Sequence, residues 1–266
     1  MTPELLLHHA DTGEPWTAAP SDDPAFDAAS AYRCALGMRA LRLARGEVAR
    51  GFKVGFTNRG IWARYGVSAP IWGTVYDSTV ASCDGTGTLS LARLCQPRIE
   101  PEAVFGFATV PPRDADLDAL FASLAWVAPG FEIVQSHLPG WKFRAPDTMA
   151  DNGLHGRLLV GPRRPMGDVA ESADALDRIL AMCPVDLVKD GAAQESGCGA
   201  NVLDSPLRAL HHFVQELRQC PGAPDIAPGD ILTTGTWTDA LPVAPGERWR
   251  AAFGAPLEGI AVTFTA

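Results

Sequence analysis

The sequence predicts an α+β protein with a curled, mostly β core. Patterns typical of helices gather in the early part of the chain, and strand patterns dominate the later part. Strands and helices do not alternate as in βαβ units, and no internal repeat is visible. Segregated elements of this kind indicate an α+β architecture. A chain of 266 residues with 47% hydrophobic residues fits one large domain, or one domain with a small appendage.

The first 50 residues are expected to form a helical segment that packs on the core. A short helix is expected around residues 4–9. A longer one is expected over residues 23–46, where Asp23 caps the start and Pro24 suits the first turn. Its apolar residues form one stripe at helical spacing, made by Tyr32, Leu36, Ala40 and Leu43.

Residues 51–266 are expected to form the β-rich part of what is a single structural unit overall. Helices are predicted over residues 58–65, over residues 114–127 with an apolar stripe from Leu117 to Leu124, and from Ser205 to about residue 218. Residues 83–88 form a turn that lacks the ending of a phosphate loop. Strand-like segments bounded by Gly and Pro turns lie at residues 51–57, 72–80, 98–109, 130–137, 158–160, 185–188, 231–233, 248–253 and 260–264.

Composition argues against several classes of partner. The net charge of -9 and the lack of a Lys/Arg-rich run argue against nucleic acid. No apolar stretch reaches the roughly 18 residues of a membrane span, and the N-terminus lacks the basic region of a signal peptide. The six cysteines are scattered without a C-x-x-C pair, which favours reduced thiols. A cytoplasmic protein is therefore expected.

Three carboxylates stand out because each lies inside an apolar, strand-like run. Glu100 and Glu102 are two residues apart, so on a strand they share a face, and Glu132 follows in the next strand-like segment. Like charges near a core are costly unless something neutralises them. A hard divalent cation such as Mg²⁺ does so with oxygen ligands. The alternative is a pair of solvated acids on a strand edge marked by Pro101.

Six segments in order resemble the fumarylacetoacetate hydrolase superfamily, and most closely its 2-keto-4-pentenoate hydratase and 4-oxalocrotonate decarboxylase branch. The resemblance spans roughly residues 28–265. The matching segments are residues 51–57 (G-x-K-V-G-F-T), 66–73 (G-V-x-x-P-x-x-G), 97–102 (P-R-I-E-x-E), 131–136, 147–152 (D-x-x-A-D-N) and 229–235 (G-D-I-x-x-T-G).

The resemblance implies a mixed β-sandwich roll of the fumarylacetoacetase C-terminal-domain type, with N-terminal helices. It also implies Mg²⁺ or Mn²⁺ bound by Glu100, Glu102 and Glu132, and a homo-oligomer, a dimer or larger. The implied substrates are small 2-oxo or 2-hydroxydienoic acids of aromatic compound catabolism. In such a site the ion is a Lewis acid that stabilises enolate charge.

Two lysines are candidates for work beside the ion. Lys53 lies on an apolar strand, where an unpaired ammonium is expensive to bury, so it is expected to hold the substrate's anionic end or to move a proton. The alternative is a lysine that snorkels at a strand end. Lys142 is a candidate substrate contact or a surface residue.

Two polar segments are further candidates with simpler alternatives. Thr234 and Gly235 are expected to offer a hydroxyl and a backbone N–H to a substrate carboxylate, or else to form a plain turn. Asp151 and Asn152 are expected to orient a loop or a water on the ion, or to form an Asx turn.

Departures from the branch patterns bear on the reaction. Hydratases of the branch carry an acid where this chain has Ile71, whereas decarboxylase-like members carry an aliphatic residue there. Loss of CO₂ suits a pocket that expels water, so Ile71, a candidate substrate contact, favours decarboxylation. Leu154 stands where a serine is common. His155 is a candidate replacement acid or base, or else a packed histidine.

Three hypotheses follow. The first is a divalent-metal-dependent lyase that acts on a small 2-oxo acid as a hydratase or a decarboxylase. The second is a fumarylacetoacetase-type C–C hydrolase of diketo acids, for which the only early histidines, His8 and His9, lie too near the terminus. The third is a non-catalytic metal-binding partner subunit, which would not need the full carboxylate set together with Lys53.

Overall fold

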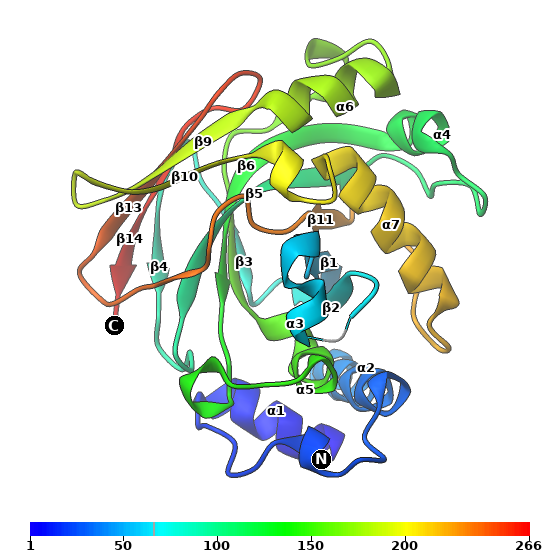
Figure 1. The fold of residues 1–266 in the computed structure, drawn as a ribbon, viewed down its shortest axis with the longest axis vertical. Helices are drawn as coiled ribbons and strands as arrows, with labels where there is room; N and C mark the ends of the chain where they lie inside the picture. The colour runs from blue at the N-terminus through cyan, green and yellow to red at the C-terminus, as the bar shows by residue number, and fades with distance from the viewer. Residues whose placement is uncertain (66) are drawn as a thin grey trace.

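Two β-sheets form the centre of the computed structural model, which describes residues 1–65 and 67–266. Gly66, which opens the segment 66–73 of the resemblance, lies outside the described residues. Figure 1 shows α1 and α2 together at one end of the molecule, with α4 and α6 at the opposite end. The α+β architecture with N-terminal helices is thus confirmed.

The larger sheet carries the strands that position the acids. Its main path runs β2-β1-β11-β5-β6-β7-β3, with β12 on β5 and β8 on β6. The bounds are β1 Ala49–Gly55, β2 Ile71–Tyr76, β3 Val80–Ser82, β5 Arg98–Phe107, β6 Leu124–Val134, β7 His155–Val160, β8 Arg164–Pro165, β11 Ile231–Thr233 and β12 Leu241–Pro242.

The smaller sheet runs β10-β9-β13-β14-β4 and packs against the larger one. Apolar side chains pack between the two sheets, among them the buried Leu159, Phe131 and Val262. The bounds are β4 Thr86–Ser90, β9 Pro184–Lys189, β10 Ala192–Cys198, β13 Arg248–Phe253 and β14 Ile260–Thr265.

Helices close the ends of the sheets. The α-helices are α1 Pro3–Thr12, α2 Ala28–Ala44, α3 Trp62–Tyr65, α4 Leu117–Ala122, α5 Ala145–Ala150, α6 Ala173–Met182 and α7 Pro206–Gln219. Short 3-10 turns lie at Pro20–Asp22, Arg59–Ile61, Pro139–Trp141, Asn152–Leu154, Met166–Asp168 and Gly199–Asn201. None of the helices described here is long and apolar enough to cross a membrane.

The predicted helix over residues 114–127 is wrong in its second half. The helix α4 ends at Ala122, and β6 begins at Leu124. The apolar stripe is genuine up to Leu120, but Leu124 pairs with Phe107 in the long β5–β6 ladder. Strand pairing and burial therefore override the local helical spacing.

The predicted start of the second helix is also wrong, by about one turn. The side chain of Asp27 accepts a hydrogen bond from Ser30 N at 2.8 Å and caps α2. Asp23 instead accepts from Ala25 N at 2.9 Å in the preceding turn. Both acids can satisfy free N–H groups, and the sequence prediction chose the earlier one. The turn predicted over residues 83–88 is wrong in its second half, because β4 begins at Thr86 and pairs with β14. Helices α5 and α6 and strands β4, β8, β10 and β12 were not predicted.

The N-terminal helices pack on the loop that follows β6. Leu6, Trp16 and Met38 share a small apolar cluster with Leu138 and Ala150. The N-terminal helices are in direct contact with the β-rich part. The division of the chain near residue 50 stays a prediction.

A buried histidine joins the N-terminal segment to this loop. His137 Nδ1 lies 2.6 Å from Asp151 Oδ1, and His137 Nε2 lies 3.1 Å from the carbonyl oxygen of His9. Both partners are acceptors, so the protonated imidazole satisfies both contacts. Burial opposes the charge, but the Asp151 carboxylate outweighs it and raises the pKa of His137.

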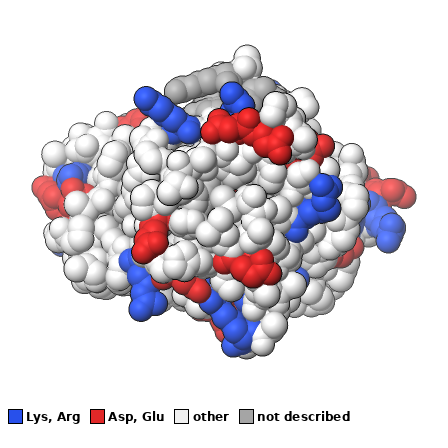
Figure 2. All heavy atoms as spheres, turned by 90° about the horizontal axis from the view of Figure 1, so that it is seen from below, with Lys and Arg blue, Asp and Glu red and all other residues white. Residues whose placement is uncertain are grey.

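The surface facing the viewer in Figure 2 carries acidic and basic side chains that are interspersed among uncharged ones. Neither sign gathers into a broad patch on this face. The expectation that nucleic acid is not a ligand stays a prediction. All six cysteines are free thiols, in agreement with the sequence.

The first prediction concerns His137→Gln. Since the folded pKa of His137 is raised, its contribution to stability is full below the unfolded value of about 6.5 and is lost as pH rises through the folded pKa. The variant should lose about 2 kcal/mol of unfolding free energy near pH 6, and less at higher pH. Thermal or urea unfolding across this range measures the difference. The exposed His8→Gln is the control, and an equal loss at every pH would contradict the prediction.

Candidate metal centre and active site

Three carboxylates meet on one face of the β5–β6 ladder. Glu100 pairs directly with Glu132 across the two strands, and Glu102 follows two residues along β5. Cross-strand partners and i, i+2 neighbours share a face, so this register brings the acids together. One ligand atom from each acid lies within 4.8 Å of the others. The expectation that Glu100 and Glu102 share a face is confirmed, and Glu132 joins them.

Two of these acids are fully buried and incompletely satisfied. The side chains of Glu102 and Glu132 are buried, and Glu100 is partly accessible. Glu102 Oε2 accepts a hydrogen bond from Gly235 N at 2.6 Å, whereas Glu102 Oε1 is buried without a hydrogen bond. Buried carboxylate oxygens without partners are costly. A divalent cation held by the three acids would supply the missing interaction, so the donor set fits Mg²⁺ or Mn²⁺.

The charges of the cluster perturb one another. Burial, reinforced by the charge of Glu132, raises the pKa of Glu100 to about 7, despite the opposing effect of Lys53. Burial and the two neighbouring acids raise the pKa of Glu102 well above its usual range. Burial would also raise the pKa of Glu132, but Lys53 and His155 outweigh it and lower that pKa. The cluster therefore resists full ionisation without an added cation.

Lys53 compensates part of this charge. It projects from β1, is 2% exposed, and its Nζ lies 3.1 Å from Glu132 Oε2. Burial alone would lower the pKa of Lys53, but Glu132, Glu100 and Glu102 outweigh it and raise the pKa. Lys53 is therefore a fixed ammonium beside the acids, as its position on an apolar strand suggested.

His155 lies against Glu132 rather than in the open site. Its Nδ1 is 2.9 Å from Glu132 Oε1, and its Nε2 is 2.9 Å from the hydroxyl oxygen of Thr79. Burial is the main cause that lowers the pKa of His155. A neutral imidazole that donates from Nδ1 and accepts the Thr79 hydroxyl satisfies both contacts. This places His155 as a group that positions Glu132, and its predicted role as acid or base finds no contact with the open cavity.

Of the three carboxylates, Glu100 lines a cavity of about 640 Å³, and Glu102 and Glu132 are buried beside it. Lys53, Glu100 and Ile71 line it, as does Gly235. The positive φ of Gly235, and its contact with Thr57 where a Cβ would lie 1.9 Å from the hydroxyl, explain the glycine there. Further lining residues are Arg98, Val134, Trp141, Phe143, Leu154, Glu195, Trp237, Asp239 and Leu241.

Two candidates from the sequence do not reach this cavity. Lys142 is exposed and is not among the lining residues, whereas its neighbours Trp141 and Phe143 are. Thr234 is buried and donates its hydroxyl to the carbonyl oxygen of Ala103 at 3.2 Å. Thr234 therefore holds the turn that presents Gly235.

The Asp-Asn pair has structural partners. Asn152 receives the N–H of Thr74 at 2.8 Å and donates to the carbonyl oxygen of Thr74 at 2.9 Å. Asn152 therefore pairs with the backbone of the edge strand β2, whose first residue, Ile71, lines the cavity. Asp151 accepts from the backbone and ring of His137. Both residues orient loops, which was one of the alternatives predicted.

Sequence reasoning missed three residues of the site. Thr79 lies in the turn after β2 and has no motif of its own. The Arg98 guanidinium lies 4.2 Å from the centre of the Trp141 ring, and both line the cavity. The i, i+2 spacing of Arg98 and Glu100 could have placed Arg98 on the same face as the acids. No local pattern pointed to Trp141.

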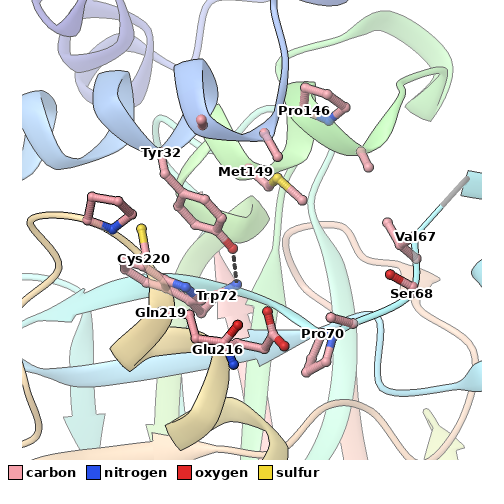
Figure 3. Close-up of a pocket in the computed structure, with 15 residues that line it drawn as sticks. Tyr32, Val67, Ser68, Pro70, Trp72, Pro146, Met149, Glu216, Gln219 and Cys220 are labelled. Carbon is pink, nitrogen blue, oxygen red and sulfur yellow. Dashed lines mark hydrogen bonds between the residues drawn. The ribbon is translucent and has the colours of Figure 1, made fainter.

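A second cavity of about 390 Å³ lies among α2, α5 and the end of α7. Figure 3 shows Tyr32, Trp72, Met149 and Glu216 around it, and the Tyr32 hydroxyl accepts a hydrogen bond from Trp72 N at 3.2 Å. Its walls are mostly apolar, and the three clustered acids do not line it. The chemistry of the site is therefore centred on the larger cavity.

Known proteins resemble this chain over most of its length. A 2-hydroxyhexa-2,4-dienoate hydratase from Comamonas testosteroni is 30% identical over 236 residues, which are 88% of this chain and 86% of that protein. A 4-oxalocrotonate decarboxylase from a Pseudomonas species is 32% identical over 207 residues, 77% of this chain and 75% of its own length. No family model matches the sequence.

A solved structure agrees with both. The 4-oxalocrotonate decarboxylase from Pseudomonas putida G7, complexed with magnesium and adipate, has a TM-score of 0.86 and 27% identity, with 99% of this chain and 98% of that one covered. The chain belongs to the 2-keto-4-pentenoate hydratase and 4-oxalocrotonate decarboxylase branch of the fumarylacetoacetate hydrolase superfamily. The resemblance drawn from six sequence segments is confirmed, and so is the fold class. These relatives are named as hydratases and decarboxylases, which are lyases, and the assignment of the three acids as metal ligands stays a prediction.

The second prediction concerns Glu102→Gln. Glutamine keeps an oxygen for the Gly235 N–H but removes the negative charge. Loss of a group that only orients a metal ligand costs roughly 10–100-fold in metal affinity. Loss of a ligand itself should therefore lower the Mn²⁺ affinity by more than about 100-fold. The metal-free variant should unfold near the wild-type temperature, because the raised pKa of Glu102 already favours its neutral form when no cation is bound. Calorimetry with Mn²⁺ and thermal unfolding measure both effects. Wild-type affinity in the variant would refute the site, and the exposed Glu171→Gln is the control.

Proposed function

We propose that this protein is a divalent-metal-dependent lyase that acts on a small 2-oxo or 2-hydroxydienoic acid. The observation that carries the proposal is the cluster of three carboxylates with Lys53, of which Glu100 and Lys53 line a cavity of about 640 Å³. Family membership supports the same reading, since relatives are named as hydratases and decarboxylases. A bound Mg²⁺ or Mn²⁺ supplies Lewis acidity for the charge that develops on the substrate's 2-oxygen.

The residues of the chain supply orientation and proton control. Glu100, Glu102 and Glu132 hold the ion. Lys53 is an ammonium fixed by Glu132, so it attracts the anionic end of the substrate and is placed to hold or donate a proton at its Nζ. Ile71 and Leu154 face the cavity with apolar atoms and exclude water from one side.

The residues that line the cavity favour decarboxylation of a 2-oxo-enedioate. At position 71 the cavity presents a buried isoleucine, which has no group to position or deprotonate a water. The solved decarboxylase with magnesium and adipate supports this choice. Hydration is the second candidate, because a dienoate hydratase aligns over 88% of this chain.

Three further expectations belong to the proposal. The small-molecule substrate is a 2-oxo acid, in keeping with the names of the relatives. We expect a homo-oligomer, a dimer or larger, and a cytoplasmic setting. Analytical ultracentrifugation would test the oligomer.

Product analysis tests the function directly. The protein is incubated with Mg²⁺ or Mn²⁺ and either 2-oxohex-3-enedioate or 2-hydroxypenta-2,4-dienoate, with and without EDTA. Loss of CO₂ from the first substrate is the expected result, and water addition to the second would identify a hydratase. Turnover that survives complete removal of the metal would refute the proposal.

The third prediction compares two lysines. Lys53→Met should lower kcat by roughly 10²–10⁴-fold, the range for loss of a proton-transferring group. Lys142→Met should retain wild-type activity, because Lys142 is exposed outside the cavity. Steady-state kinetics and thermal unfolding are measured together, since Lys53→Met also leaves Glu132 without its cation. A well-folded Lys53→Met with wild-type turnover would contradict the role assigned to Lys53.

The fourth prediction concerns Ile71→Asp. An acid at this position of the cavity wall can hold a water, so the variant should shift products from decarboxylation toward hydration. Chromatography with mass spectrometry gives the product ratio, and Ile71→Asn, which adds polarity without a base, is the matched control. An unchanged ratio in a folded Ile71→Asp would show that position 71 does not choose the reaction.

A further inference from the structure

The second cavity, of about 390 Å³, has no part in the proposed reaction. Its volume lies in the range of small-molecule sites, roughly 300–1,000 Å³. Helices α2, α5 and α7 and the start of β2 supply its walls, which are mostly apolar. Figure 3 shows Tyr32 and Met149 on one side of the cavity, and Trp72, Pro70 and Glu216 on the other. A cavity of this kind suits an organic molecule with an apolar body.

Strand alternation separates this cavity from the metal centre. Ile71 lines the larger cavity, whereas its neighbours Pro70 and Trp72 line the second one. Successive side chains of a strand point to opposite faces, so the start of β2 forms a wall with one cavity on each side. The three clustered acids do not line the second cavity. A molecule bound there therefore occupies a site of its own.

Glu216, on α7, supplies the charge of the second cavity. Among the described residues that line the cavity, it alone carries a side chain that is charged at neutral pH. It is partly buried, and within residues 1–65 and 67–266 its carboxylate has no hydrogen bond or ion pair. Burial alone raises the pKa of Glu216. The carboxylate is thus partly desolvated without compensation, which favours a cation beside it.

The other titratable groups that line the cavity are neutral. Burial is the main cause that raises the pKa of Tyr32, so the phenol keeps its proton. Its oxygen accepts a hydrogen bond from Trp72 N at 3.2 Å. Burial likewise raises the pKa of the Cys220 thiol. The described lining groups therefore leave the charge of Glu216 unbalanced, and that charge repels anions.

Two aromatic rings add a second feature that attracts a cation. Tyr32 and Trp72 stack with their ring centroids 4.7 Å apart and their planes at 17°, and both line the cavity. Aromatic rings attract ammonium groups through their electron-rich faces, and tryptophan does so best. The thioether of Met149 adds a polarisable apolar contact. A carboxylate beside aromatic and apolar walls matches the chemistry of an organic ammonium ion.

We propose that the second cavity binds a small organic ammonium ion with an apolar body, with Glu216 as its counter-ion and Tyr32 and Trp72 as its aromatic wall. The apolar body of the ligand packs on the side of the cavity formed by Pro146 and Met149. The site lies apart from the three acids, so the proposal does not depend on which 2-oxo acid the protein converts.

Two probes of similar shape test the proposal. Benzylamine carries an ammonium group at neutral pH, and benzyl alcohol is uncharged. Each is titrated by calorimetry into the full-length protein saturated with Mn²⁺, so that the three clustered acids do not attract the amine. Benzylamine should bind about 10-fold or more tightly than benzyl alcohol, because a hydrogen bond to a charged group is stronger than one between neutral groups.

The decisive variant is Glu216→Gln, which keeps the shape of the side chain but removes its charge. Benzylamine affinity should fall roughly 10–100-fold, while Mn²⁺ affinity stays unchanged. The exposed Glu171→Gln is the control. Tyr32→Leu should weaken benzylamine binding about 3-fold or more through loss of the ring. Tyr32→Phe is its matched control, because it also removes the acceptor for Trp72 N but keeps the ring.

Three results would overturn the proposal. One is benzylamine that does not bind, or that binds no more tightly than benzyl alcohol. Another is wild-type benzylamine affinity in Glu216→Gln. The third is a Glu216→Gln protein whose sedimentation differs from that of the wild type while benzylamine has no effect on either, since the cavity would then be covered by a second copy of the chain.

Discussion

The repulsion among three carboxylates on adjacent strands is the constraint around which the rest of the site is organised. The β5–β6 register places Glu100 opposite Glu132, so the strands cannot pair without bringing the charges together. Lys53, His155 and the Gly235 N–H each relieve part of the cost. They come from β1, from the start of β7 and from the turn after β11. The curled sheet matters because it lets these separate segments converge on one pair of strands.

Much of the site could be predicted from the chain because strand alternation is a strictly local rule. Two acids two residues apart on a strand share a face wherever that strand lies in the fold, and a lysine within an apolar strand demands a counter-charge. The register that adds Glu132 is not local. It depends on how β5 pairs with β6, and the mistaken helix over residues 114–127 shows how poorly that pairing can be judged from periodicity around Leu124.

The direction in which a side chain points from a turn could not be predicted either. Trp141 and Lys142 are neighbours, and only the positive φ values of Gly140 and Trp141 decide that the indole lines the cavity while the ammonium faces outward. The surroundings of His155, at the start of a strand, could not be predicted for the same reason. A neutral-pH acid or base was a reasonable expectation for an isolated histidine. Its burial between Thr79 and Glu132 makes it a support instead.

The division of labour between strands and loops bears on how such a site can diversify. The acids lie in the interior of the long β5–β6 ladder, where a substitution disturbs the core. Ile71 lies at the first residue of an edge strand, and Trp141, Phe143 and Leu154 lie in turns that line the same cavity. Changes there alter the shape and polarity of the cavity but leave the three clustered acids in place. One set of acids held in a strand ladder can therefore serve cavities of different shape, because mutations in the turns and at the edge strand leave that set intact.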